Sequence, residues 1–329
     1  MELCAQSLVV VSNGERTVMT QLSIVIPCYN EEAVLPETIR RFSALLDRLA
    51  AAGKIDPARS GIYFVDDGSH DATWTLIEQA SARDARLHGM KLSRNCGHQV
   101  ALLAGLQSVP GDAIVSIDAD LQDDIEAIET MLDRFVAGDD IVYGVRNDRR
   151  SDSMFKRATA VGYYRLLAWM GVEITINHAD YRLMSRRAVD CLQRYQEINL
   201  FLRAIVPTLG FRSSTVEYRR AERFAGESKY PLRKMLKLAF EGISSFSAFP
   251  LHLITLIGLV TFVGSMFLGL WALGVRAFGN SFPGWASTVV PMYFLGGIQL
   301  LCTGIIGEYL SKIYLEVKGR PRYFIEKVL

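Results

Sequence analysis

Short apolar runs alternate with amphipathic segments over residues 22 to about 145. The apolar runs are rich in β-branched residues, which favour strands, and they cover Leu22–Pro27, Ile62–Asp66, Leu87–Leu92, Ala113–Asp118 and Ile141–Val145. Apolar residues at helical spacing lie between them, in Ala33–Ala52, Asp71–Arg83, Gln99–Gln107 and Ile125–Val136. This alternation predicts an α/β domain with a mostly parallel sheet that helices cover on both faces.

Two long stretches near the C-terminal end contain no Asp, Glu, Lys or Arg. They cover residues 242–275 and 277–307. At a rise of about 1.5 Å per residue, each holds a helix long enough to cross a hydrocarbon core of about 30 Å. We therefore expect two transmembrane helices, at about 249–275 and 287–310. Two buried helices of a soluble core are the alternative, which the length of the charge-free runs disfavours.

The basic residues flank these spans on one side. Lys and Arg are frequent at 219–237 and 312–327, whereas the connecting loop holds only Arg276. By the positive-inside rule both termini and the α/β domain lie in the cytoplasm, and the protein is multi-pass. Residues 229–247 combine a basic arc with an apolar face, which predicts an amphipathic helix in the membrane interface.

The chain is therefore divided into five segments. We expect an N-terminal extension at 1–20, the cytoplasmic α/β domain at 21–228, the amphipathic juxtamembrane helix at 229–247, the two spans within 248–312 and a basic cytoplasmic tail at 313–329. The whole chain has 36 basic and 35 acidic residues and is 50% hydrophobic. This balance excludes a disordered chain and argues against a nucleic-acid partner.

Polar residues follow each predicted strand. They read PCYNEE from Pro27, DDGSHD from Asp66, SRN from Ser93 and DADLQD from Asp118, and Arg146 follows the fifth strand. Ligands of open α/β sheets bind beyond the carboxyl ends of the strands. The chain has no dinucleotide-binding G-x-G-x-x-G after the first strand and no P-loop, so neither of those sites is supported.

Asp118 and Asp120 stand two residues apart at a strand end. A lone Asp-x-Asp is commonly a solvated turn, but here other acidic loops face the same crevice. Carboxylate oxygens suit Mg²⁺ or Mn²⁺, and such a metal would in turn bind a diphosphate. The sequence therefore predicts a metal site at Asp118 and Asp120.

Three motifs resemble a known enzyme family. SIVIPCYNEE, VDDGSHDAT and DADLQDD are similar to signatures of family 2 glycosyltransferases with the GT-A (nucleotide-diphospho-sugar transferase) fold. RNCGHQVALLAGL, DYRLMSRRAV, RFAGESKYPLRKML and GEYLSKIYLEVKGRPRY resemble the narrower group that transfers sugar to polyprenyl phosphate. That group includes bactoprenol glucosyltransferases, the aminoarabinose transferase and dolichol-phosphate mannose synthase. The chain departs from it at Asp123-Asp124-Ile125, where relatives commonly carry a Pro pair.

The resemblance implies a role for each matching residue. The residues expected to bind the donor and its diphosphate are Pro27, Tyr29, Glu31, Asp67, Asp118, Gln122 and Arg146. Among them, Asp67 would read the nucleobase, and Asp118 and Asp120 would hold Mg²⁺ or Mn²⁺. Asp180 and Arg182 match an acceptor-side motif, and Arg223, Ser228 and Lys229 match a loop over the donor or lipid phosphate.

The implied reaction is inverting transfer of a sugar, glucose first, from a UDP-sugar to undecaprenyl or another polyprenyl phosphate. It would occur at the cytoplasmic face of a bacterial inner membrane and serve cell-envelope glycans such as lipopolysaccharide. Asp120 would act through the metal, and Asp180 would orient the acceptor or act as a base. His98 has either a catalytic or a structural role, and we favour the structural one.

Several alternatives stay open. The donor could carry aminoarabinose or be GDP-mannose. A processive polysaccharide synthase normally shows a Gln-x-x-Arg-Trp motif and more spans, and this chain has neither. An inactive membrane scaffold is disfavoured by the intact carboxylates. Glycines in the spans permit a homo-oligomer, and a flippase is a further expected partner.

Overall fold

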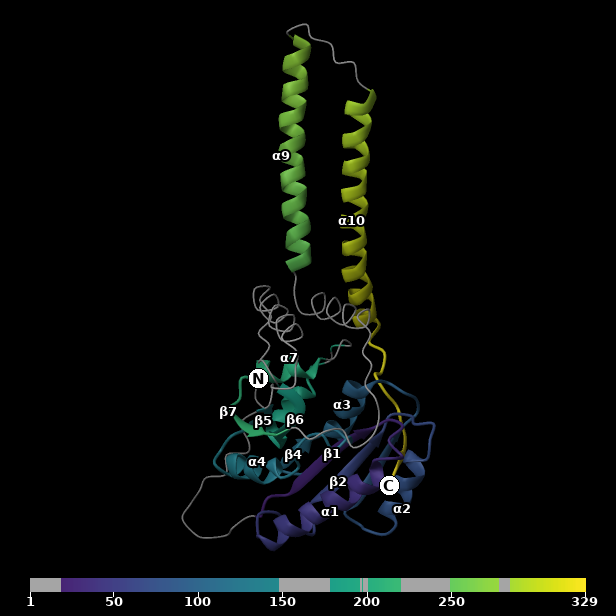
Figure 1. Ribbon diagram of the computed structural model, residues 1–329, viewed down its shortest axis with the longest axis vertical. Helices are drawn as coiled ribbons and strands as arrows, with labels where there is room; N and C mark the ends of the chain where they lie inside the picture. The colour runs from purple at the N-terminus through teal and green to yellow at the C-terminus, as the bar shows by residue number, and fades with distance from the viewer. Residues whose placement is uncertain (1–18, 148–177, 196, 198–200, 220–248, 278–284) are drawn as a thin grey trace.

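The computed structural model describes residues 19–147, 178–195, 197, 201–219, 249–277 and 285–329 (Figure 1). The first part of the domain runs β1 (Leu22–Cys28), α1 (Leu35–Ala51), β2 (Gly61–Asp66), α2 (Thr73–Ser81), β3 (Leu87–Leu92), α3 (His98–Ser108), β4 (Ala113–Ser116), α4 (Ala127–Val136) and β5 (Ile141–Arg146). The later elements are β6 (His178–Ser185), α6 (Arg186–Leu192), α7 (Leu202–Thr208), β7 (Ser213–Tyr218), α9 (Phe249–Ala277), α10 (Trp285–Lys318) and β8 (Ile325–Val328).

The strands of the described residues form one sheet of eight strands in the order β7-β5-β6-β4-β1-β2-β3-β8. Strands β4, β1, β2 and β3 are parallel neighbours, with Ile24 opposite both Ile62 and Val115. Strand β6 inserts antiparallel between β4 and β5, and β8 pairs antiparallel with β3. The sheet is therefore mixed and mostly parallel at its centre, which confirms the predicted α/β class.

Two hydrophobic clusters lie on opposite faces of the sheet. Ile24 and Ile26 of β1 point into the cluster that includes α1 and α4, whereas Val25 points into the one with α3, α6 and α7. This alternation follows from the twofold period of a strand. Helix α3 packs so close to the sheet at Gly105 that a Cβ there would overlap the side chain of Val25. Helices cover both faces, as the sequence pattern predicts.

The five predicted strands and four predicted helices all form, with ends that differ from the prediction by at most two residues. Strand β6 was not predicted, because its sequence, HADYRLMS, mixes charged and apolar residues. Inside the sheet Asp180, Tyr181 and Arg182 are all buried. Their burial is possible because Asp180 and Arg182 neutralise each other at 2.7 Å.

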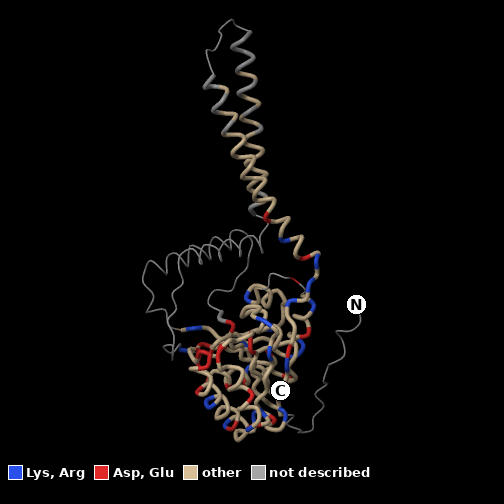
Figure 2. The backbone as a smooth tube through the Cα atoms, turned by 90° about the vertical axis from the view of Figure 1, so that its right-hand side faces the viewer, with Lys and Arg blue, Asp and Glu red and all other residues tan. Residues whose placement is uncertain are grey.

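Helices α9 and α10 lie side by side and extend away from the domain (Figures 1 and 2). Both cover the spans expected from the sequence, and α10 continues to Lys318, eight residues beyond the expected end. Among the described residues, one segment, Phe294–Lys318, is long and apolar enough to cross a membrane by length and composition. Figure 2 shows the charged residues of α10 only at its end near the domain. The predicted juxtamembrane helix at 229–247 lies outside the described residues.

The predicted basic tail contains an additional strand of the sheet. After α10 ends, β8 pairs with β3, opposing Val328 to Met90 and Lys327 to Lys91. Leu329 closes this pairing by donating its N–H to the carbonyl of Gly89 at 2.8 Å. The residues that follow the long helices therefore form the edge strand of the same sheet that contains β1.

Candidate active site

A cavity of about 390 Å³ opens beyond the carboxyl ends of β1, β2 and β4. It brings together residues from strands, helices and loops that are far apart in the sequence: Pro27, Cys28, Tyr29, Glu31, Asp67, Asn95, Gly97, His98, Ala101, Asp118, Ala119, Asp120, Asp180 and Arg203. Seven of these were predicted as site residues: Pro27, Tyr29, Glu31, Asp67, Asp118, Asp120 and Asp180. The convergence expected from a parallel sheet is therefore present.

The loops after β1 and β2 hold each other in place. Asn30, which has a left-handed φ of 54°, donates from its backbone N–H to Oγ of Ser69 at 3.0 Å. Its side-chain oxygen accepts from the N–H of His70 at 2.9 Å. Tyr29, beside it, lines the cavity with a side chain that is 43% exposed. This leaves a phenol ring available to a ligand at the cavity wall.

Asp67 is buried and organises the next loop. Its two oxygens accept from the N–H groups of Cys96 at 2.6 Å and Gly97 at 2.8 Å. Burial raises the pKa of Asp67, although the two N–H donors act in the opposite direction. Gly68 follows with φ of 68°, and a Cβ there would lie 2.6 Å from the N atom of Asn95. The predicted contact of Asp67 with a nucleobase stays a prediction.

Asp118 and Asp120 face the cavity together. Burial raises the pKa of Asp118 to about 6, and the nearby carboxylates of Asp180, Asp123 and Asp120 act in the same direction, against His98. Carboxylates that lie close together repel one another when ionised, and a divalent cation bound between them would stabilise their ionised form. The oxygen donors therefore fit Mg²⁺ or Mn²⁺.

Such a site would be sparse. Within the described ranges no group of three or more His, Cys, Asp or Glu side chains could hold a metal ion. Two carboxylates suffice only if substrate oxygens and water complete the coordination, which is common for Mg²⁺.

Leu121, between Asp120 and Gln122, has a left-handed φ of 56°, an unfavourable conformation for leucine that is often found at functional sites.

Asp180 accepts from donors on three elements. Its Oδ1 accepts from Arg182 at 2.7 Å, and its Oδ2 accepts from Gln99 at 3.0 Å and Arg203 at 3.1 Å. Burial raises the pKa of Asp180, but the bond from His98 and the two guanidinium charges outweigh it and hold the pKa well below its usual range. A carboxylate held in this way is a poor proton acceptor, so of the two roles considered for Asp180 the geometry favours orientation.

His98 bridges the two carboxylate groups. Its Nε2 lies 3.4 Å from Oδ1 of Asp118 and 3.6 Å from Oδ2 of Asp180. Burial lowers the pKa of His98, but Asp180 and Asp118 outweigh burial and raise it. His98 therefore lies in the cavity wall, next to the predicted metal ligands and not in the core.

Three predicted residues, Gln122, Arg146 and Arg182, are not among those that line the cavity. Arg182 is buried, and Gln122 donates its backbone N–H to Asp120 at 3.2 Å. Arg146 donates to the Tyr218 hydroxyl at 3.2 Å and to Asp123 at 3.4 Å, so its nearest partners are protein groups. Arg223, Ser228 and Lys229 lie outside the described residues.

Two residues of the cluster were not singled out from the sequence. Gln99 and Arg203 reach Asp180 across 81 and 23 residues of chain, respectively. Arg203 offers one signal, since it is the only charged residue in the apolar run FLRAIV. An arginine in such a run is a candidate for an ion pair, and its partner is Asp180 at 3.1 Å.

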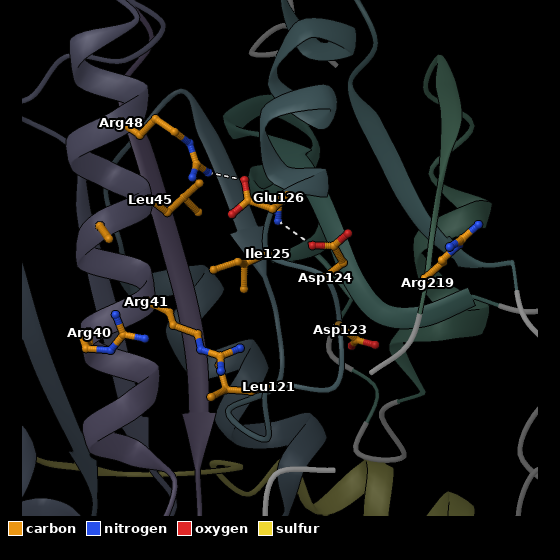
Figure 3. Close-up of a pocket in the computed structure, with 11 residues that line it drawn as sticks. Arg40, Arg41, Leu45, Arg48, Leu121, Asp123, Asp124, Ile125, Glu126 and Arg219 are labelled. Carbon is orange, nitrogen blue, oxygen red and sulfur yellow. Dashed lines mark hydrogen bonds and ion pairs between the residues drawn. The ribbon is translucent and has the colours of Figure 1, made fainter. Parts of the chain in front are cut away.

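A second cavity, of about 340 Å³, shares the same loop (Figure 3). Leu121 lines it together with residues of α1 and of the segment from Asp123 to Glu126, and Figure 3 shows Arg48 directed at Glu126 and Arg41 ending near Leu121. Arg48 pairs with Glu126, while Arg40 and Arg41 pair with Glu37. These opposite charges satisfy one another, so this cavity is the weaker candidate.

Comparison with known proteins gives the chain a family. The model described as Glycosyl transferase family 2 matches residues 23–193. An uncharacterized glycosyltransferase of Bacillus subtilis, YkoT, is 50% identical over 307 residues, which cover 93% of this chain and 91% of the relative. The SfII prophage-derived bactoprenol glucosyl transferase of Shigella flexneri is 41% identical over 312 residues, covering 93% and 98%.

Solved structures are more distant. A mannosyltransferase of Pyrobaculum calidifontis in complex with GDP-Man and Mn²⁺ has a TM-score of 0.46 and 16% identity, covering 91% of this chain and 86% of that one. Glucosyl-3-phosphoglycerate synthase of Mycobacterium tuberculosis, in complex with Mn²⁺, UDP and phosphoglyceric acid, has a TM-score of 0.45 and 19% identity, covering 68% and 76%.

Proposed function

The chain belongs to glycosyl transferase family 2, and from this premise we propose that it transfers glucose from UDP-glucose to polyprenyl phosphate at the cytoplasmic face of a bacterial inner membrane. The observation that carries the proposal is the likeness to bactoprenol glucosyl transferases over 93% of the chain. That likeness includes both long helices and is not limited to the α/β domain. The enzyme class is thus established by family, and the donor, acceptor and topology are the proposed parts.

The cavity supports a nucleotide-sugar donor. We assign the nucleoside to the wall formed by Pro27, Tyr29, Glu31 and Asp67, and the diphosphate to the end near Asp118 and Asp120. Mg²⁺ or Mn²⁺ bound there would neutralise the departing diphosphate. A UDP-aminoarabinose type donor or GDP-mannose is the main alternative, because the residues that line the cavity do not by themselves select one sugar.

The long helices support a lipid acceptor. Large apolar side chains are exposed along both of them, among them Phe267 (66%), Trp271 (58%) and Phe294 (67%). An apolar surface of this kind is stable in a lipid bilayer and unfavourable in water. We therefore propose that α9 and α10 both cross the membrane and that the cavity faces a lipid phosphate at its surface.

A phosphate acceptor simplifies the chemistry. A phosphate monoester, with a second pKa of about 6, is largely ionised at neutral pH. Its oxygen can attack the anomeric carbon of the sugar on the side opposite the diphosphate, with inversion and without a strong base. The protein then has to hold two anionic substrates in line, which positioning groups accomplish. The low pKa of Asp180 agrees with a mechanism that requires no carboxylate base there.

The test is a donor screen with the purified full chain. UDP-glucose, UDP-galactose, UDP-N-acetylglucosamine and GDP-mannose, each radiolabelled, are incubated with undecaprenyl phosphate and Mg²⁺ or Mn²⁺. The expected result is label in the organic-extractable lipid from UDP-glucose only, and none when EDTA is added or the lipid phosphate is omitted.

The other outcomes are equally clear. Transfer from another donor would replace glucose in the proposal and keep the acceptor. Growth of a long polymer without lipid phosphate would indicate a processive synthase. Absence of transfer from any donor, with a correctly folded protein, would overturn the proposal and favour a membrane scaffold. Copurification of a homo-oligomer or a flippase would test the remaining expected partners.

A further inference from the structure

Arg203, near the start of α7, presents a cation to the cavity. Its side chain lines the cavity with Asp118 and Asp120 and is 41% exposed, whereas Arg182, the other arginine on Asp180, is 2% exposed. Arg203 donates to Asp180 from two nitrogens, at 3.1 Å from Nη2 and 3.4 Å from Nε. Of the two arginines, Arg203 is the one that a ligand can reach.

The backbone next to Arg203 is held at both of its polar groups. Leu202 donates its N–H to Oε1 of Gln99 at 3.2 Å, and its carbonyl accepts from Nη1 of Arg182 at 3.2 Å. Gln99 and Arg182 also donate to Asp180. The carboxylate of Asp180 thus links α3, β6 and α7, and the position of Arg203 is fixed before any substrate arrives.

Arg203 lies close to the predicted metal ligands. It pairs with Asp180 at 3.1 Å, and Nε2 of His98 lies 3.6 Å from Asp180 and 3.4 Å from Asp118. Asp118 and Asp120 are the carboxylates that would hold the cation. A metal–diphosphate group at those carboxylates would leave the guanidinium facing another phosphate oxygen, and a planar guanidinium is well suited to bind phosphate with two hydrogen bonds.

We propose that Arg203 is a phosphate-binding residue of this cavity. The proposal rests on the proposed function, in which both substrates carry phosphate. The oxyanion belongs either to the phosphate monoester of the lipid or to the nucleotide diphosphate, and both present the same chemistry to the guanidinium. Two measurements on one variant distinguish these sources.

The test compares Arg203→Gln with the wild-type full chain. One arm measures the KM for undecaprenyl phosphate at saturating UDP-glucose, and the other measures the Kd of UDP with Mn²⁺ by calorimetry. Loss of a charge-assisted bond is expected to raise one of these constants about tenfold to hundredfold. A raised KM assigns Arg203 to the lipid phosphate, and a raised Kd assigns it to the nucleotide. Arg203→Lys, which keeps the charge without the planar fork, is expected to lie between the two proteins.

Arg212→Gln is the matched control. Arg212 also pairs an exposed guanidinium with a buried carboxylate, that of Asp139 at 2.8 Å, but it does not line the cavity. Its constants are expected to stay at wild-type values. Wild-type constants in Arg203→Gln, or equal changes in both variants, would overturn the proposal. If Arg203→Gln does not fold, Arg203→Lys carries the test, and wild-type constants in that folded variant would overturn a role for the guanidinium. The calorimetric arm needs no acceptor, so it remains readable even if the wild-type protein transfers no sugar to lipid.

Discussion

Asp120 is the residue on which the proposed metal site can be tested most directly. Removing its carboxylate leaves Asp118 as the one remaining predicted ligand, so the metal and the diphosphate it neutralises should both bind weakly. We expect Asp120→Ala to reduce sugar transfer to below roughly 1% of wild type, since a metal contributes several kcal/mol at a departing phosphate. Radiolabel transfer at saturating Mn²⁺ measures this.

Asp133→Ala is the control for that loss. Asp133 is an exposed carboxylate that pairs with Lys54 on the surface, and such pairs contribute about 1 kcal/mol or less. Its transfer rate should remain near that of the wild type. Full activity of Asp120→Ala would show that Asp120 is not a metal ligand, and Asp118 would then be the one predicted ligand left.

Asp180→Asn separates orientation from base catalysis. If Asp180 orients Arg203, the variant keeps measurable turnover and its main change is a raised KM for the same phosphate substrate that depends on Arg203. Combining Asp180→Asn with Arg203→Gln should then cost less than the sum of the two single changes. If Asp180 is a base, the variant loses kcat instead, and the pH profile of kcat changes shape.

The same variant should alter stability in a pH-dependent way. Removing one partner of a buried ion pair costs roughly 3 kcal/mol. Because the folded-state pKa of Asp180 is held below its usual range, its ion pairs stabilise the fold above the unfolded-state pKa, about 4, and this stabilisation is lost as the pH falls through the folded-state value. The difference in unfolding free energy between wild type and variant should therefore shrink as the pH falls below about 4. A difference that grows in acid would contradict these ion pairs.

The residues that the sequence could and could not assign differ in how they reach the cavity. Tyr29, Asp67, Asp118 and Asp120 follow strands directly, so the topology of a parallel sheet places them at one edge. Arg203 follows no strand of the predicted alternation. It reaches Asp180 only because β6 inserts beside β4 and α7 packs on that face. The lone charge in its apolar run marks Arg203 as unusual, but it does not indicate where in the tertiary structure the side chain lies.

At the scale of elements, strand β8 protects the edge of the sheet. It pairs with β3, and the N–H of Ser93 donates to the carbonyl of Phe324 at 3.0 Å just before the strand begins. Tyr323 adds a hydrogen bond to Gln107 of α3 at 3.1 Å. Deletion of residues 320–329 would expose the backbone of β3, which invites edge-to-edge association.

We expect this truncation to lower the midpoint of thermal unfolding by several degrees and to promote aggregation. The measurements are a fluorescence melt and light scattering in detergent. Lys327→Gln is the control, because it removes only an exposed ion pair with Glu78, which contributes little. A truncated protein that melts like the wild type and stays monodisperse would show that β3 needs no cover.

The elements that the sequence pattern predicts are those with a clean period. Strands β1 to β5 are apolar and rich in β-branched residues, and α1 carries its buried leucines at helical spacing. Strand β8, with the sequence IEKV, is short and exposed at every position. Nothing in such a sequence distinguishes it from a solvated tail, and only the unpaired edge of β3 makes it a strand.

At the scale of the whole molecule, β8 constrains the topology. Strand β1 precedes both long helices and β8 follows them, yet both strands belong to the same sheet. The two ends of the α9–α10 pair must therefore lie on the same side of any membrane, so the proposed crossing requires both helices, arranged as a hairpin. This conclusion is independent of the positive-inside rule, which predicts the same arrangement from charge.

The hairpin predicts which positions a membrane-impermeant maleimide can reach. The reagent is added to bacterial cells whose outer membrane has been removed and whose inner membrane is intact, and these are the intact cells of this experiment. Ser281→Cys, in the connecting segment, should be labelled in intact cells, because it would lie outside the cytoplasm. Glu326→Cys, on exposed β8, should be labelled only after lysis. The wild-type chain, which keeps its five cysteines, is the control for background labelling. Labelling of Glu326→Cys in intact cells, with Ser281→Cys protected until lysis, would reverse the orientation. Protection of both until lysis would mean that the helices do not cross, and in either case the proposed cytoplasmic site for a lipid phosphate would have to be abandoned.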